Sequence, residues 1–82
     1  MILKNRLKQI EEVAGTAVVV EGKTAIIGLH LKDGLEQNAV NTVRRRAEEL
    51  AKSAEVDIEY TSVTANDYLV GLIEEMERKR SG

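Results

Sequence analysis

Residues 16–29 read TAVVVEGKTAIIGL and contain two apolar runs, rich in β-branched side chains, on either side of a short polar stretch. Such residues favour β-strands. The polar stretch, residues 21–23 (EGK), is typical of a tight hairpin turn. The second run continues to Lys32 and alternates in side-chain character. The sequence therefore predicts an antiparallel hairpin, with strands at residues 16–21 and 23–32.

This alternation indicates which face of the hairpin packs on a core. A two-residue turn places Val18 and Val20 on that core face. Ala17 and Val19 then join Ile26 on the opposite face, whereas a three-residue loop would exchange the two sets. In the second strand, the core-facing residues are Ala25, Ile27, Leu29 and Leu31.

Apolar residues at helical spacing predict helices before and after the hairpin. The first helix spans residues 2–14 and ends at Gly15, a residue that suits a helix C-terminus. The second follows a capping-box pattern in residues 33–36 (DGLE) and runs to about residue 54. We expect this long helix to cross over one face of the sheet.

The last third of the chain predicts one more strand and one more helix. Polar and apolar residues alternate over residues 56–61, and an apolar stripe follows over residues 65–79. We expect one α/β domain over residues 1–82, with a frayed tail at about 80–82. The order α-β-β-α-β-α predicts an α+β fold, a two-layer sandwich in which all helices cover one face of a three-stranded sheet.

Composition excludes several classes of function. The chain has 14 acidic and 12 basic residues, for a net charge of -2. This balance argues against a general nucleic-acid binder, which usually has a basic excess. Cysteine is absent, which rules out disulfides, thiolate metal sites and a thiol nucleophile. No apolar run is long enough for a transmembrane helix.

No residue pattern predicts catalysis or a cofactor. His30 is the only histidine, and we expect an ordinary half-exposed strand residue that Asp57 or Glu59 could approach if the third strand lies beside the second. The run at residues 44–46 (RRR) fans out around its helix. The glycines form no phosphate-binding or GXXG pattern. We therefore expect no enzyme, no metal, no cofactor and no small-molecule substrate.

The uncovered sheet face is the remaining candidate site. It would carry Ala17, Val19 and Ile26, with His30 at its rim. Exposed apolar atoms are common on any protein, but a cluster can also mark an interaction surface. The second interpretation predicts a protein partner or a weak homo-oligomer.

Residues 16–29 also resemble the "ATVVVTGNTAYVGV" hairpin of the YhcN/YlaJ-type sporulation lipoproteins. Residues 31–34 (LKDG), leading into a charged helix, are similar as well, and residues 57–58 with 63–70 (VTANDYLV) resemble the family's "VTTDPDLV" passage. The chain departs from the family in three ways. Asn66 or Ala65 replaces a proline, the turn after the first helix is short, and the signal and lipid-bearing cysteine are missing.

The resemblance implies a non-enzymatic structural or protein-interaction domain of the spore envelope in endospore-forming bacteria. The membrane would be reached only through an N-terminal lipid anchor absent from this chain. If an N-terminal segment has been trimmed from the chain, the resemblance implies that the domain is anchored to the membrane in the spore envelope. Otherwise the expected localisation is cytoplasmic. By analogy of topology alone, the order also resembles ring-building modules of secretion and sporulation complexes. The alternative is a cytosolic regulatory or nucleic-acid-binding module with a KH-like layout, against which the missing GXXG and the negative charge count.

Overall fold

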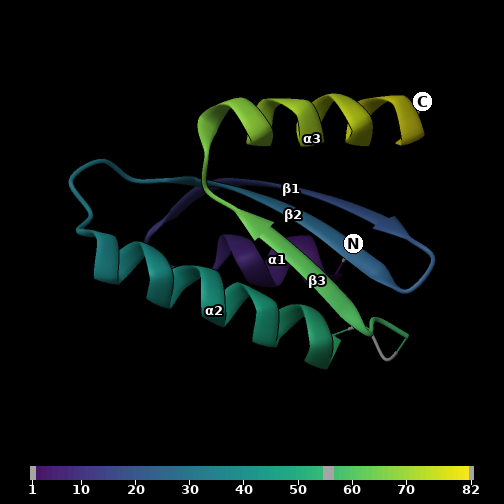
Figure 1. The fold of residues 1–82 in the computed structure, drawn as a ribbon, viewed down its shortest axis with the longest axis horizontal. Helices are drawn as coiled ribbons and strands as arrows, with labels where there is room; N and C mark the ends of the chain where they lie inside the picture. The colour runs from purple at the N-terminus through teal and green to yellow at the C-terminus, as the bar shows by residue number, and fades with distance from the viewer. Residues whose placement is uncertain (1, 55–56, 82) are drawn as a thin grey trace.

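The computed structural model describes residues 2–54 and 57–81 and contains the predicted elements in the predicted order (Figure 1). The α+β class is confirmed. The elements are α1 (Ile2–Lys8), β1 (Val13–Glu21), β2 (Thr24–Leu31), α2 (Gln37–Ala54), β3 (Tyr60–Thr64) and α3 (Asp67–Ser81). No helix in the described ranges is long and apolar enough to cross a membrane.

The three strands form one mixed sheet in the order β1-β2-β3. β1 and β2 are antiparallel, whereas β2 and β3 are parallel and joined through α2. The hairpin turn has two residues, because Glu21 pairs with Thr24. Gly22 has φ 58°, the sign that a type II′ turn requires at its first central position. The two-residue alternative is therefore the correct one, and Val18 pairs with Ile27 on the core face.

The main core lies between the sheet and the helices α1 and α2. The apolar faces of these helices meet the core faces of all three strands, as their periodicity predicts. Leu29 on β2 and Val43 on α2 are both buried, as expected. The buried residues of this core are Leu3, Leu7, Ile10, Val13, Val18, Ala25, Ile27, Leu29, Val43, Ala47, Ala51, Ile58 and Val63.

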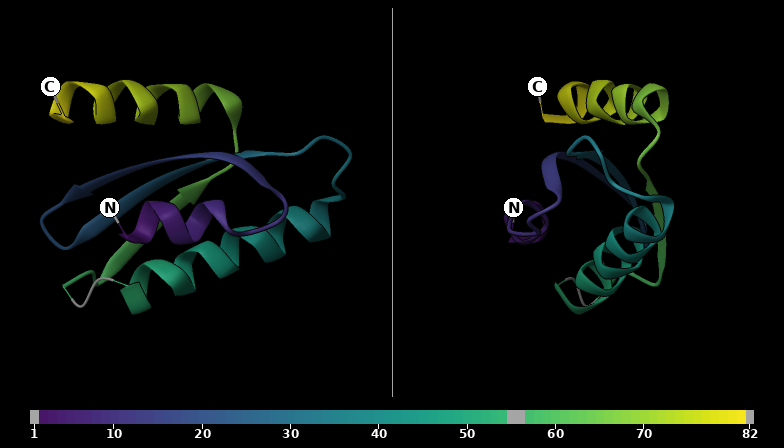
Figure 2. Two further views of the ribbon diagram at one scale, coloured as in Figure 1. Left: turned by 180° about the vertical axis from the view of Figure 1, so that it is seen from behind. Right: turned by 90° about the vertical axis from the view of Figure 1, so that its left-hand side faces the viewer.

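Helix α3 corrects the predicted layering. It lies on the opposite face of the sheet from α1 and α2, so the helices do not share one face (Figures 1 and 2). The physical reason is that this face is apolar too, and Ala17 and Val19 form a second core with Ile73. Gly28 of β2 allows α3 to pack closely on the sheet, because a Cβ at this position would lie only 3.1 Å from the Val70 side chain of α3.

Several boundaries also differ from the prediction. α1 ends at Lys8, where the chain tightens into a turn in which the Ile10 N–H donates to the Leu7 carbonyl at 3.2 Å. β1 therefore begins at Val13, and Gly15 lies within the strand instead of ending a helix. β3 begins only at Tyr60, and the first residue of the predicted strand, residue 56, lies outside the described residues.

The predicted frayed tail is helical as far as it is described. α3 continues to Ser81. Residue 82 lies outside the described residues.

Candidate interaction surface

The predicted interaction face is covered by the chain itself. Ala17 is 0% and Val19 is 2% exposed, and Ile26 is partly buried against the same cluster beneath α3. His30 lies half-exposed at the rim. A partner cannot reach Ala17 or Val19 while α3 is in place. The apolar side chains that suggested a binding partner therefore pack against α3 of the same chain.

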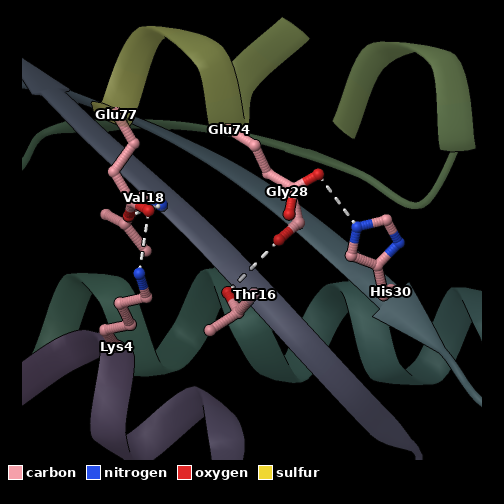
Figure 3. A network of polar contacts seen from close by, with 7 residues as sticks. All are labelled: Lys4, Thr16, Val18, Gly28, His30, Glu74 and Glu77. Carbon is pink, nitrogen blue, oxygen red and sulfur yellow. Dashed lines mark hydrogen bonds and ion pairs between the residues drawn. The ribbon is translucent and has the colours of Figure 1, made fainter. Parts of the chain in front are cut away.

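His30 is paired with a residue that the sequence did not indicate. Its Nε2 lies 3.1 Å from Oε1 of Glu74 on α3, as Figure 3 shows. β3 does lie beside β2, but Glu59, one of the two acidic residues that could have approached His30, lies at the opposite end of β2, where its side chain contacts Lys23. Within the described ranges, no group of three or more His, Asp or Glu side chains is placed to hold a metal ion. The pair links a strand to a helix.

The arginine run does not form one patch. Arg44 lines an open polar hollow beside the loop between β2 and α2, whereas Arg46 lies near Arg6 of α1. All three arginines are exposed. In the part of the chain that the structure describes, none of them forms an ion pair with Glu48 or Glu49. The run is therefore distributed over the surface of α2.

Charged side chains close the outer edge of β1. Glu77 of α3 accepts a hydrogen bond from the Val18 backbone N–H at 2.9 Å and another from Lys4 Nζ at 2.8 Å (Figure 3). Arg80 donates to the Val20 carbonyl at 3.3 Å and pairs with Glu21. These contacts occupy backbone groups that an added strand would need.

The ionisation of Glu77 fits this role. Partial burial acts to raise the pKa of Glu77, but the hydrogen bonds from Lys4 and Val18 and the positive charges of Lys4 and Lys8 outweigh it. The pKa therefore lies below its ordinary value. Glu77 is thus an anion held at the junction of α1, β1 and α3.

The other edge of the sheet, along β3, is open. The Tyr60 N–H donates at 3.1 Å to the carbonyl of Lys23, the turn residue that directly precedes β2. Because backbone groups alternate in direction along a strand, those of Thr61 and Val63 point to the outer edge. No side chain among residues 2–54 and 57–81 hydrogen-bonds to that edge. The strand, YTSVT, contains neither a charge nor a proline, the usual protections of an exposed edge.

Exposed apolar side chains of α3 gather on the flank nearer β3. Glu74 and Arg78 line a hollow with Lys4 and Thr16, which places their flank of α3 toward β1. Leu69, Leu72 and Met76 follow one another at three- and four-residue spacing on the opposite flank, and all three are exposed. Tyr60 of β3 is 65% exposed. The β3–α3 surface is defined as the side chains of Tyr60, Ser62, Leu69, Leu72 and Met76 together with the outward backbone groups of Thr61 and Val63.

The apolar stripe predicted on the last helix therefore has two parts. Ile73 is buried against the sheet with Val70, whereas Leu69, Leu72 and Met76 remain exposed. Helical spacing indicates the whole apolar stripe but does not distinguish the residues that face the sheet from those that remain exposed. One signal was present: Leu69, Val70, Leu72, Ile73 and Met76 together span more of the helix than a single sheet contact buries.

Comparison with known proteins gives one family. The sequence profile described as "Sporulation lipoprotein YhcN/YlaJ" matches residues 1–82, the whole chain. No curated protein matches it. The family resemblance inferred from the hairpin and the last strand-to-helix passage is thereby confirmed.

Proposed function

The chain belongs to the YhcN/YlaJ family of sporulation lipoproteins, and we propose that it is a non-enzymatic structural or protein-interaction domain of the spore envelope. The family name supports a role in sporulation and attachment to a membrane through a lipid. On this proposal, the lipid holds the domain at the membrane, and the folded chain contacts another protein of the envelope.

The observation that carries the proposal is the β3–α3 surface. It combines an open strand edge with three exposed apolar side chains of one helix flank, Leu69, Leu72 and Met76. Clustered exposed apolar side chains are typical of contact surfaces. An open edge can also pair with a strand of a partner. Both features lie on the same side of the molecule.

The polar contacts favour a structural role over a catalytic one. Thr16 Oγ1 donates to the Gly28 carbonyl at 3.2 Å, which joins β1 to β2. Glu77 and Arg80 hold α3 against the edge of β1. His30 joins β2 to α3 through Glu74. Each of these side chains is therefore accounted for by the fold that it stabilises.

The test is retention in the envelope of mature spores after detergent has dissolved the lipid anchor. In a sporulating host, the wild-type lipoprotein and the control Asn5→Lys, an exposed position on α1, should remain with the envelope fraction. Leu72→Lys should be extracted, because a charge in the contact opposes its burial. Complete extraction of the wild type would refute a protein contact. Retention of Leu72→Lys at the wild-type level would refute this surface.

A further inference from the structure

We propose that the β3–α3 surface binds a second copy of this chain, with the two β3 strands antiparallel about a two-fold axis at Ser62. This inference rests on the proposed function and names its partner. The two three-stranded sheets would then form one continuous six-stranded sheet, with an α3 helix from each copy on the same face.

The backbone of β3 determines the pairing register. Within the strand, only Thr61 and Val63 direct their N–H and C=O groups outward, since Tyr60 pairs with Thr24 of β2 and its N–H is bonded to the adjacent Lys23 carbonyl. Placing Thr61 opposite Val63 of the second copy uses both residues of both copies and forms four hydrogen bonds. Ser62 then lies opposite Ser62 of the second copy, and the exposed side chains of this pair point to the face that carries α3.

The two sheet edges differ in a way that selects β3. Glu77 and Arg80 bind outward backbone groups of β1, and α1 packs against the same strand. β3 has no such cap in the described part of the chain. α2 packs against β3 on one face of the sheet, α3 lies on the opposite face, and no helix of the described residues runs along the outer side of β3 in Figure 2.

The absence of charge at this edge points to self-pairing. A two-fold contact places each residue near its own copy, so any charge close to the axis meets a like charge. The chain has 26 charged residues among its 82, counting 12 basic and 14 acidic. Even so, the segment Tyr60–Thr64 contains none. A contact with a different protein would tolerate charges here and could be strengthened by them.

The dimer is expected to be weak. A standard interface buries about 800 Å² per partner, which would be about one-seventh of the 5416 Å² surface of this chain. The proposed contact consists of two short strands and a few apolar side chains, so we expect it to be no larger than this standard interface. We therefore expect dissociation constants of about 10 µM to 1 mM, a range in which attachment of both copies to one membrane would favour pairing.

The experiment is sedimentation velocity on the purified chain from about 5 µM to about 1 mM. The wild type and Asn5→Lys should form dimers with rising concentration. Ser62→Lys and Ser62→Glu should each associate at least about tenfold more weakly, because like charges then face each other at the axis. An equimolar mixture of the two variants should regain dimerisation, since opposite charges meet. Unchanged melting temperatures would show that both variants are folded.

Amide hydrogen exchange supplies a second reading of the same contact. The Thr61 and Val63 N–H groups should become protected as concentration rises in the wild type, and should remain unprotected in Ser62→Lys.

Three results would overturn the inference: a monomeric wild type at every concentration, undiminished association of Ser62→Lys, or no recovery in the mixture. Detergent retention of the wild type together with a monomer in solution would instead assign the surface to another protein. Such a result would leave the proposed function standing.

Discussion

Ile73→Ala tests the position of α3 directly. The Ile73 side chain is 6% exposed and packs with Ala17 and Val19 in the smaller core. Removing a buried isoleucine to alanine typically costs about 2–5 kcal/mol. Alanine recovers about 0.4 kcal/mol through its higher helix propensity. The small size of this core allows some collapse around the cavity, so we expect a loss of about 2–3 kcal/mol.

This loss is large for a chain of 82 residues, whose free energy of unfolding is about 4–12 kcal/mol at typical values per residue. The melting temperature should fall by about 8–24 °C. The matched control is Leu72→Ala, one position earlier on the same helix and 43% exposed, which should cost less than about 1 kcal/mol. Urea unfolding followed by circular dichroism measures both changes. Equal losses for the two variants would refute the packing of Ile73 on the sheet.

Three further predictions concern the core, the β1 edge and His30. Leu29→Ala should cost about 2–5 kcal/mol in urea unfolding, since Leu29 is fully buried, and near-wild-type stability would show that the strand faces are wrongly assigned. The lowered pKa of Glu77 means that the ionised group stabilises the fold above its unfolded pKa, ordinarily 4.5, and that this contribution disappears as pH falls through the lower folded value. Glu77→Gln should therefore reduce stability at neutral pH and approach the wild type in acid, and a deficit that is constant with pH would contradict this. Zinc at about 1 mM should leave the melting temperature unchanged, whereas a rise that His30→Ala abolishes would reveal a metal site.

The hairpin was predictable because its information is local. The period-two pattern in residues 16–29 defines the two faces, and Gly22 supplies the positive φ of the turn. The same reasoning applies to α2, where Val43, Ala47 and Ala51 recur at four-residue spacing and are all buried. In both the hairpin and α2, residues close together in the sequence are enough to show which face is buried.

The position of α3 was not predictable in this way. α2 joins two parallel strands, so the handedness of the crossover limits the face it can occupy. α3 follows the last strand, and no such rule assigns it a face. The apolar residues Ala17 and Val19 on the face opposite α2 were the available signal. From the sequence they predict a surface for a protein partner or a second copy of the chain, whereas in the structure the chain's own helix covers them.

The unequal edges also bear on the assembly that we propose. A sheet with two open edges can add copies at both sides and grow without limit. Here Glu77 and Arg80 occupy the edge of β1, and among residues 2–54 and 57–81 the edge of β3 is the one left open. Pairing of two β3 strands uses the open edge of both copies, so assembly through the sheet stops at a closed dimer. A ring would require two different contact surfaces on each copy. The topological analogy with ring-building modules therefore does not extend to assembly through this edge, and the proposed contact predicts a dimer.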